Sequence, residues 1–330
     1  MLAEDAQAKI PSCCSPARGV GRPSAEPTAA ATTGARSTPP QQRATGLVEL
    51  PGGTFLMGAE DADAVIANRE GPVRTVHVEA FAVGTTAVTN HEFATFVDAT
   101  GYVTDAERHC WSFVFAGLLP DDLAPTRGVA AAPWWREVHG ADWQHPEGPH
   151  SRFDERGDHP AVHVSHRDAL AYCAWAGVRL PTEREWEYAA RGGLVQARYP
   201  WGDDLLVQDQ HMCNIWQGEF PTRNTQDDGW VGTAPARSFT PNGYGLFNVA
   251  GNVWEWCADP FDAPSTSDAA AGVPRVIRGG SYLCHASYCN RYRVAARSAN
   301  TPDSTTGNMG FRVASSLPAP PQTHATEITT

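Results

Sequence analysis

The part of the sequence after residue 194 constrains the fold most, because almost no helical period can be found in it. Short apolar runs there alternate with turns of Gly, Asn, Asp and Pro, which predicts short strands and turns up to the C-terminus. The 330 residues include 30 glycines, 26 prolines and 11 tryptophans, so turns and buried indoles are expected and long helices are not. We therefore predict a mixed α/β fold with little regular secondary structure.

Regular elements are expected earlier in the chain. Strands are predicted over 47–57, on both sides of a Pro51-Gly52-Gly53 turn, and over 73–83, where apolar and polar residues alternate. From 111 to 156 the sequence is aromatic, proline-rich and irregular, which predicts a layer of loops.

Three helices are predicted, because each has a capping residue before it and a glycine at its end. They are 91–101 after Thr89 and Asn90, 167–177 after Ser165, and 183–193 after Thr182, which forms a capping box with Glu185.

One domain is expected over 47–316. Residues 1–46 are mostly Ala, Pro, Thr, Ser, Gly and Arg and contain no aromatic side chain. They cannot bury enough apolar area to offset chain entropy, which predicts a disordered tail in which Cys13 and Cys14 are incidental thiols. Residues 317–330 are predicted to be a second short tail.

The charge and the cysteine pattern exclude several classes of protein. The formal net charge is -12, which argues against nucleic acid as the main partner. No run of 18 apolar residues occurs, so no membrane span is expected, and the N-terminus lacks the apolar stretch of a secretory signal, which predicts a cytoplasmic protein. The eight cysteines have irregular spacing without a zinc pattern, so neither a disulfide framework nor structural zinc is expected.

The segment 275–298 carries the most informative chemistry. Cys284 and Cys289 bracket four residues, and two thiolates on a short loop are soft ligands that select Cu(I). Spacing alone leaves an inert pair or a small disulfide ring open as alternatives. Ser281 and Tyr288 flank the pair, where they either orient a substrate or satisfy local backbone groups. Four arginines near the pair in sequence would favour the thiolate form: Arg278, Arg291, Arg293 and Arg297.

Two further segments, 214–230 and 247–256, mix Asn, Asp and Glu with Gly in short loops. Such loops often only make turns, but side-chain oxygens of this kind also suit Ca²⁺. The candidate donors are Asn214, Asp228, Asn248 and Glu255.

His159 and His163 are spaced i, i+4, and a nonheme iron site would add a carboxylate to them. Ser165 stands where that carboxylate is expected. The segment is predicted to be a strand, in which the two side chains lie about 13 Å apart. Both histidines are therefore predicted to be structural.

Over about 47–316 the chain resembles the formylglycine-generating enzymes, also called sulfatase-modifying factors. The resemblance is carried by LPGGTFLMG, VTNHEFATFV, HPAVHVS, LPTEREWEYAARGG, NIWQGEFP, PNGYGLFNVAGNVWEW, RGGSYLCHASYCNRYR and NTPDSTTGNMGFR. The segment LCHASYCNRYR is the most specific, because it contains the cysteine pair. The resemblance implies the sulfatase-modifying-factor fold, which is distantly like C-type lectins.

The resemblance also implies a copper-dependent oxidase. Cys284 and Cys289 would bind Cu(I), with Cys284 the more exposed, reactive thiol and Cys289 the more buried ligand. Ser281 and Tyr288 match active-site positions. The partner would be an unfolded sulfatase polypeptide, and the cysteine of its Cys-x-Pro-x-Arg motif would be converted to Cα-formylglycine with O₂. A monomer is expected.

Two structural calcium sites are implied by the same resemblance. The first would use the Asn214 side chain, the Ile215 carbonyl, the Asp228 side chain and the Trp230 carbonyl. The second would use the Asn248 side chain, the Gly251 carbonyl, the Val253 carbonyl and the Glu255 side chain.

The chain also departs from the secreted members of this family, whose disulfide cysteines are replaced here by Ala190, Val294 and Val313. These replacements support a reducing compartment. The cysteines expected to be free thiols are Cys110, Cys173, Cys213 and Cys257.

Two other functions compete with the oxidase. A nonheme-iron oxygenase that forms carbon–sulfur bonds would need a His/His/carboxylate set, and a non-catalytic lectin-like binding module would lack the cysteine pair. Both discriminating features favour the oxidase.

Overall fold

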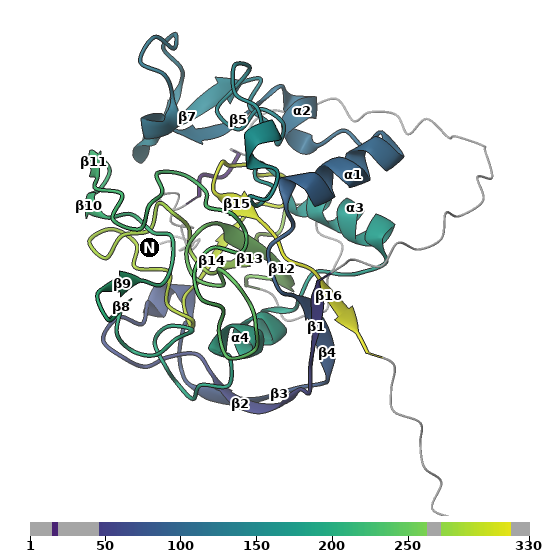
Figure 1. The fold of residues 1–330 in the computed structure, drawn as a ribbon, viewed down its shortest axis with the longest axis vertical. Helices are drawn as coiled ribbons and strands as arrows, with labels where there is room; N and C mark the ends of the chain where they lie inside the picture. The colour runs from purple at the N-terminus through teal and green to yellow at the C-terminus, as the bar shows by residue number, and fades with distance from the viewer. Residues whose placement is uncertain (1–14, 19–45, 263–271, 318–330) are drawn as a thin grey trace, which may run out of the picture.

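The computed structural model describes residues 15–18, 46–262 and 272–317. Within these ranges the strands form six small sheets of two to four strands, and four α-helices accompany them. The predicted mixed fold with little regular secondary structure is confirmed. In Figure 1 helix α4 (Glu183–Arg191) lies near strands β2 and β3 at one end of the molecule, helices α1 and α2 lie near β5 and β7 at the other, and the sheet that contains β12 and β13 lies between them.

The first sheet joins the two ends of the domain. Strand β4 (Phe81–Gly84) pairs with β1 (Leu47–Leu50) on one side and with β16 (Ala314–Ser316) on the other. Strands β2 (Gly53–Met57) and β3 (Arg74–Val78) form a separate antiparallel pair.

The single strand predicted over 73–83 is therefore wrong, because the chain turns between Val78 and Phe81. Gly52, at a φ of 70°, lies against this corner, and a Cβ there would be 2.4 Å from the Val78 carbonyl oxygen. Because the two turns pack this closely, β2 pairs with β3 in one sheet while β1 pairs with β4 in another.

The three predicted helices are confirmed as α1 (Asn90–Thr100), α3 (His166–Ala176) and α4 (Glu183–Arg191). In each, the N-cap hydroxyl accepts a backbone N–H and the carboxylate three residues later accepts the N-cap N–H, so both halves of the capping box are made. Each ends on a glycine in the left-handed conformation. A fourth helix, α2 (Asp105–His109), has the same box at Thr104 and Glu107 and was not predicted.

The layer of loops predicted for 111–156 is wrong in part. Strand β5 (Trp111–Phe115) pairs with β7 (Ala132–His139), and β7 also pairs with β6 (Gly128–Val129). Trp135 of β7 has no exposed surface. The pairing partners are separated by a proline-containing connection, so local patterns do not reveal their register.

The central sheet has the order β14–β13–β12–β15. Its strands are β12 (Trp254–Pro260), β13 (Arg275–Arg278), β14 (Arg297–Asn300) and β15 (Met309–Gly310). Trp254, Trp256, Ile277 and Met309 of this sheet lie in the largest apolar core. The remaining elements are β8 (Leu206–Val207), β9 (Gln210–His211), β10 (Gly218–Glu219), β11 (Arg223–Asn224) and the 3₁₀ turns η1 (Ile66–Asn68), η2 (Ala116–Leu118) and η3 (Asp154–Arg156).

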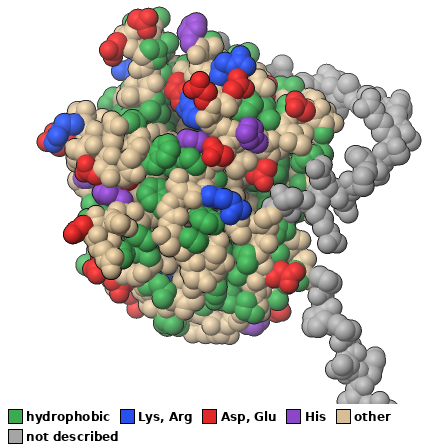
Figure 2. Space-filling view, in the orientation of Figure 1, with side chains coloured by type: hydrophobic (Ala, Val, Ile, Leu, Met, Phe, Trp, Pro, Cys, Tyr) green, Lys and Arg blue, Asp and Glu red, His purple; other side chains and the backbone are tan. Residues whose placement is uncertain are grey.

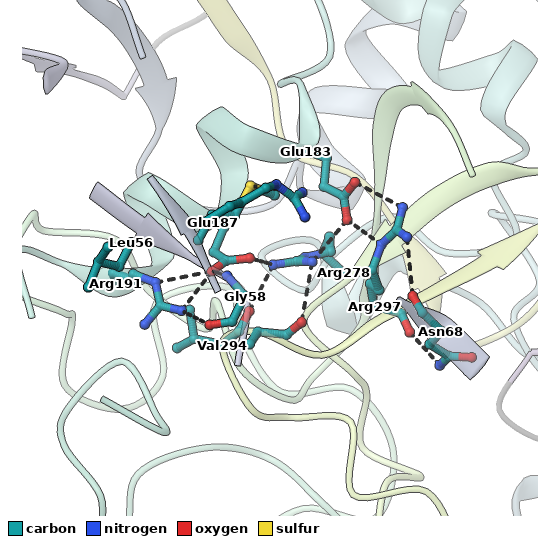
Figure 3. A network of polar contacts seen from close by, with 12 residues as sticks. Leu56, Gly58, Asn68, Glu183, Glu187, Arg191, Arg278, Val294 and Arg297 are labelled. Atoms are coloured by element: carbon teal, nitrogen blue, oxygen red, sulfur yellow. Dashed lines mark hydrogen bonds and ion pairs between the residues drawn. The ribbon is translucent and has the colours of Figure 1, made fainter. Parts of the chain in front are cut away.

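A buried network of ion pairs joins α4 to the central sheet (Figure 3). Arg278 of β13 contacts Glu183 at 3.0 Å and also pairs with Glu187. Arg191 contacts Glu187 at 2.7 Å, and Arg297 of β14 contacts Glu183 at 2.6 Å. Each charge in this apolar setting faces an opposite charge, which offsets the cost of burying it.

On the surface, acidic side chains are scattered among hydrophobic and uncharged ones over the face shown in Figure 2. Among the described residues no helix combines the length and the hydropathy needed to cross a membrane.

Four residues of the predicted N-terminal tail, Ser15–Arg18, are described, and they lie against the domain. Ser15 and Arg18 are buried, at 2% and 8% relative exposure. These four residues are an exception to the prediction of disorder for 1–46. Residues 1–14, 19–45 and 318–330, with Cys13 and Cys14, lie outside the described residues.

Candidate active site

The loop after β13 brings the two cysteines of the CHASYC segment together. The carbonyl oxygen of His285 accepts the backbone N–H groups of Tyr288, Cys289 and Asn290 at 3.0, 3.0 and 3.1 Å. This turn returns Cys289 to Cys284, and the two thiols hydrogen-bond to each other. All six described cysteines are thiols rather than disulfides, so the small disulfide ring is not formed.

The relative exposure of the two cysteine residues is the reverse of the expected one. Cys284 is 1% exposed and Cys289 is 9% exposed. Cys284 is held from two sides, because its carbonyl oxygen accepts the Trp216 N–H at 3.1 Å and its sulfur accepts the Ser281 N–H at 3.4 Å. The expectation that Cys284 is the more exposed thiol is therefore wrong.

The expectation that nearby arginines favour the thiolate is also wrong for most of them. Burial raises the pKa of Cys284 well above its usual value, and Cys289 raises it further, whereas Arg291 lowers it. The other three arginines form ion pairs with glutamates: Arg278, Arg293 and Arg297. Burial thus favours the neutral thiol of Cys284, and the charge of a bound cation would oppose this effect.

Ser281 lies directly beside the pair. It is fully buried, and its hydroxyl oxygen accepts hydrogen bonds from the Asn308 side chain at 3.0 Å and the Leu283 N–H at 3.3 Å. Asn308 in turn accepts the Thr306 hydroxyl at 2.7 Å. Sequence reasoning gave no role to Asn308, because it is 27 residues from Ser281 and only the fold brings the two together.

Tyr288 lies on the other side of the pair, in a group of aromatic rings. Its ring stacks on Phe220 at 4.5 Å between centroids and meets Trp134 edge-on at 5.0 Å. Phe220 also packs on Trp216, whose backbone binds Cys284. The structure therefore brings together all four residues predicted for catalysis, Ser281, Cys284, Tyr288 and Cys289, and adds an aromatic wall that the sequence did not indicate.

The first predicted calcium set has one oxygen that fits a cation. Asn214 is 1% exposed, and its Oδ1 has no hydrogen-bond partner among the described residues. Asp228 lies beside it, since its carboxylate accepts the N–H groups of Ile215 and Trp230, each at 3.0 Å. Burial raises the pKa of Asp228, which a bound cation would oppose. The donor set suits Ca²⁺.

In the second predicted calcium set, one of the two side-chain donors is already engaged by other residues. Asn248 Oδ1 is also buried without a hydrogen-bond partner in the described part of the chain. The Glu255 carboxylate, however, accepts two hydrogen bonds from Arg312, at 2.6 and 2.7 Å, and one from the Trp186 indole at 2.7 Å. A calcium ion there would have to share this carboxylate with an arginine, so the second set of residues fits calcium less well than the first.

Both histidines singled out in the sequence have structural partners, as predicted. His163 is fully buried between the Ser112 hydroxyl at 2.7 Å and the Pro146 carbonyl at 2.8 Å. His159 contacts the Thr233 hydroxyl at 2.9 Å. Their segment is not the expected strand, since only an isolated bridge from Pro160 is present. Over the described ranges, no group of three or more His, Cys, Asp or Glu side chains is arranged to hold a metal.

Comparison with known proteins identifies similar sequences over most of the chain. Residues 32–317 match the family described as sulfatase-modifying factor enzyme 1-like domain. The chain is 58% identical over 287 residues to a formylglycine-generating enzyme of Thermomonospora curvata, covering 83% of this chain and 95% of that protein. It is 45% identical over 280 residues to a Bos taurus protein named inactive C-alpha-formylglycine-generating enzyme 2, with coverages of 83% and 89%.

A solved structure is similar as well. PvdO from Pseudomonas aeruginosa superimposes with a TM-score of 0.59 at 26% sequence identity, over 82% of this chain and 94% of that one. A relative named formylglycine-generating enzyme and one named inactive are thus both similar to the chain, so the activity has to be argued from the residues of the site.

Proposed function

Because this chain belongs to the sulfatase-modifying factor enzyme family and has its fold, we propose that it oxidises a cysteine of a sulfatase polypeptide to Cα-formylglycine. The observation that carries the proposal is the contact between the thiols of Cys284 and Cys289 within one short turn. Two adjacent thiols can hold one soft metal ion between them.

We propose Cu(I) as the cofactor, held by these two sulfurs. Adjacent sulfur donors fit a soft monovalent ion, and the charge of the ion would convert the buried thiols to thiolates. Copper, when bound, would supply electron transfer to O₂. The substrate cysteine would offer a third sulfur, and its peptide would carry a Cys-x-Pro-x-Arg motif.

The surrounding residues hold the cysteine pair in place. The Ser281 N–H orients the Cys284 sulfur, and Asn308 fixes the Ser281 hydroxyl beside it. Tyr288 packs against Phe220 and Trp134 beside the loop. A site fixed in this way needs little rearrangement when the substrate arrives.

The overall reaction balances as a two-electron oxidation of the substrate. The cysteine side chain loses two electrons and two protons, and addition of water then releases sulfide and leaves the aldehyde. O₂ accepts those electrons and protons. An added thiol reductant supplies two more of each when the oxygen product is water.

The test is direct conversion of a peptide. The protein, loaded with copper under reducing conditions, is incubated with a Cys-x-Pro-x-Arg peptide in the presence and absence of O₂, and the products are analysed by mass spectrometry. We expect an aldehyde in place of the thiol only when both copper and O₂ are present. Binding of the peptide without any conversion would instead favour the non-catalytic module. The iron oxygenase is not supported, since both ring nitrogens of His163 are already engaged.

We also propose that one structural calcium ion is held by Asn214, Asp228 and the carbonyl groups of Ile215 and Trp230. The unpartnered, buried oxygen of Asn214 supports this proposal. The ion would stabilise the loop that also carries Trp216, whose backbone binds Cys284.

A further inference from the structure

The four described residues of the N-terminal segment belong to a sequence pattern that lies before the part of the chain that matches the family. Cys14-Ser15-Pro16-Ala17-Arg18 has cysteine, proline and arginine at the first, third and fifth positions, which is the Cys-x-Pro-x-Arg pattern of the proposed substrate. The match to the family begins only at residue 32. The pattern lies within residues 1–46, whose composition predicts a disordered tail.

The arginine of the pattern lies in a pocket built for it. The guanidinium of Arg18 lies 3.9 Å above the centre of the Trp111 ring, and its Nη2 donates to the Trp111 carbonyl oxygen at 2.7 Å and to the Thr305 hydroxyl at 2.8 Å. The backbone N–H of Arg18 donates to the Ser304 hydroxyl at 3.0 Å. Burial lowers the pKa of Arg18 to about 10, while the charges of Asp303 and Asp105 act to raise it, so the side chain is still a cation at neutral pH.

The residues before the arginine are held by a second set of buried polar groups. The Asn300 side chain donates to the Ser15 hydroxyl at 2.9 Å and to the carbonyl oxygens of Ser15 and Pro16 at 3.3 Å. Asn300 has no exposed surface. Pro16 is buried with Ser15 and Arg18, whereas Ala17, at an unspecified position of the pattern, is less covered. A fully buried amide that donates to this segment indicates a site made to receive a peptide backbone.

A series of polar contacts connects the bound segment to Cys284 of the cysteine pair. The Ser15 and Thr306 hydroxyls are 3.3 Å apart, and Thr306, Asn308, Ser281 and Cys284 follow in an unbroken series of contacts of 2.7, 3.0 and 3.4 Å. Ser15, and not Arg18, makes the first contact of this series, and Cys14 directly precedes Ser15 in the sequence.

We propose that Ser15–Arg18 is the part of a tethered substrate-like segment that occupies the peptide groove of this protein and competes with substrate. The inference rests on the proposed function for the identity of that groove. Because the segment belongs to the same chain, it competes at an effective concentration on the order of millimolar, whatever the concentration of protein. The groove is free for another peptide only in the fraction of molecules from which the segment has dissociated.

The test measures peptide binding without copper, so that it does not depend on turnover. A fluorescent Cys-x-Pro-x-Arg peptide is titrated by anisotropy into the metal-free protein, its Arg18→Ala variant and an Arg22→Ala control, which removes the same charge outside the pattern. We expect Arg18→Ala to bind the peptide about tenfold more tightly than the unchanged protein, and Arg22→Ala to leave the affinity unchanged. A labelled peptide with alanine in place of its arginine should bind to none of the three.

A second measurement needs no variant. Trypsin cleaves after Arg18 only when the segment leaves its pocket, so an excess of the unlabelled peptide should accelerate this cleavage, and the alanine peptide should not. Equal affinity of Arg18→Ala and the unchanged protein, with cleavage indifferent to the peptide, overturns the inference even if copper-dependent conversion is observed. Tighter binding by Arg18→Ala without any conversion supports the groove and contradicts the oxidase, so the two failures are distinguishable.

Discussion

At the scale of single residues, the cysteine pair lies among side chains that come from distant parts of the sequence. Cys284, Cys289, Ser281 and Tyr288 were predicted together because they lie within one short segment. The raised pKa of Cys284 and the diversion of three arginines into ion pairs were not predicted. They depend on partners far away in sequence, and no local pattern specifies which carboxylate an arginine will meet.

Replacement of either cysteine of the pair tests the proposed chemistry. We expect Cys284→Ser and Cys289→Ser each to lower peptide conversion by at least a hundredfold, because an oxygen donor is a poor ligand for Cu(I). Copper content, circular dichroism and conversion would be measured for each variant. Cys110→Ser, at an exposed thiol, is the control and should convert peptide normally. Full activity in either pair variant contradicts the assignment.

Burial of His163 makes the stability of the fold depend on pH. Its pKa is lowered from 6.5 to about 4 in the folded state, so the unfolded chain binds a proton over this interval that the folded chain does not. The contribution of neutral, buried His163 to the free energy of unfolding is complete above pH 6.5 and is lost as the pH falls to about 4. The free energy of unfolding of the unchanged protein should therefore fall between pH 7 and 4.5. We expect His163→Gln to make this fall about 3 kcal/mol smaller, as measured by urea unfolding at the two pH values.

The exposed His77 gives the control for that experiment, since 59% of its side-chain surface is accessible. His77→Gln should leave the difference in unfolding free energy between the two pH values unchanged. A His163→Gln variant that loses as much stability on acidification as the unchanged protein would contradict the assigned role of burial.

At the scale of elements, the sequence predicted what short-range contacts decide. The capping boxes of α1, α3 and α4 are closed within four residues, and all three helices were found. The sheet of β5, β6 and β7 was missed, because its register is set by pairing across a long connection. The corner between β3 and β4 was missed for the same reason.

The attachment of α4 to the central sheet depends on Glu187, which is 1% exposed and faces both Arg278 and Arg191. Glu187→Gln keeps the shape but leaves two buried arginines without a full countercharge. We expect it to lower the free energy of unfolding by about 3–5 kcal/mol, measured by denaturant titration. Glu219→Gln breaks only the exposed pair with Arg223 and should change stability by less than about 1 kcal/mol.

At the scale of the whole molecule, much of the domain is irregular loop held by side chains, and the proposed calcium ion is part of that support. We expect chelation to lower the melting temperature by about 5 °C, since the ion binds only the folded chain. Asp228→Asn should melt lower than the unchanged protein and respond little to the chelator. An unchanged melting temperature, with calcium removal verified by elemental analysis, would contradict the site.

Strand β16 pairs with β4, so the last ordered strand of the domain completes the sheet begun by the first. Arg312 and Asn308, which precede β16, likewise reach back to Glu255 and Ser281. A nascent chain leaving the ribosome therefore cannot complete these contacts until almost all of the domain has been translated.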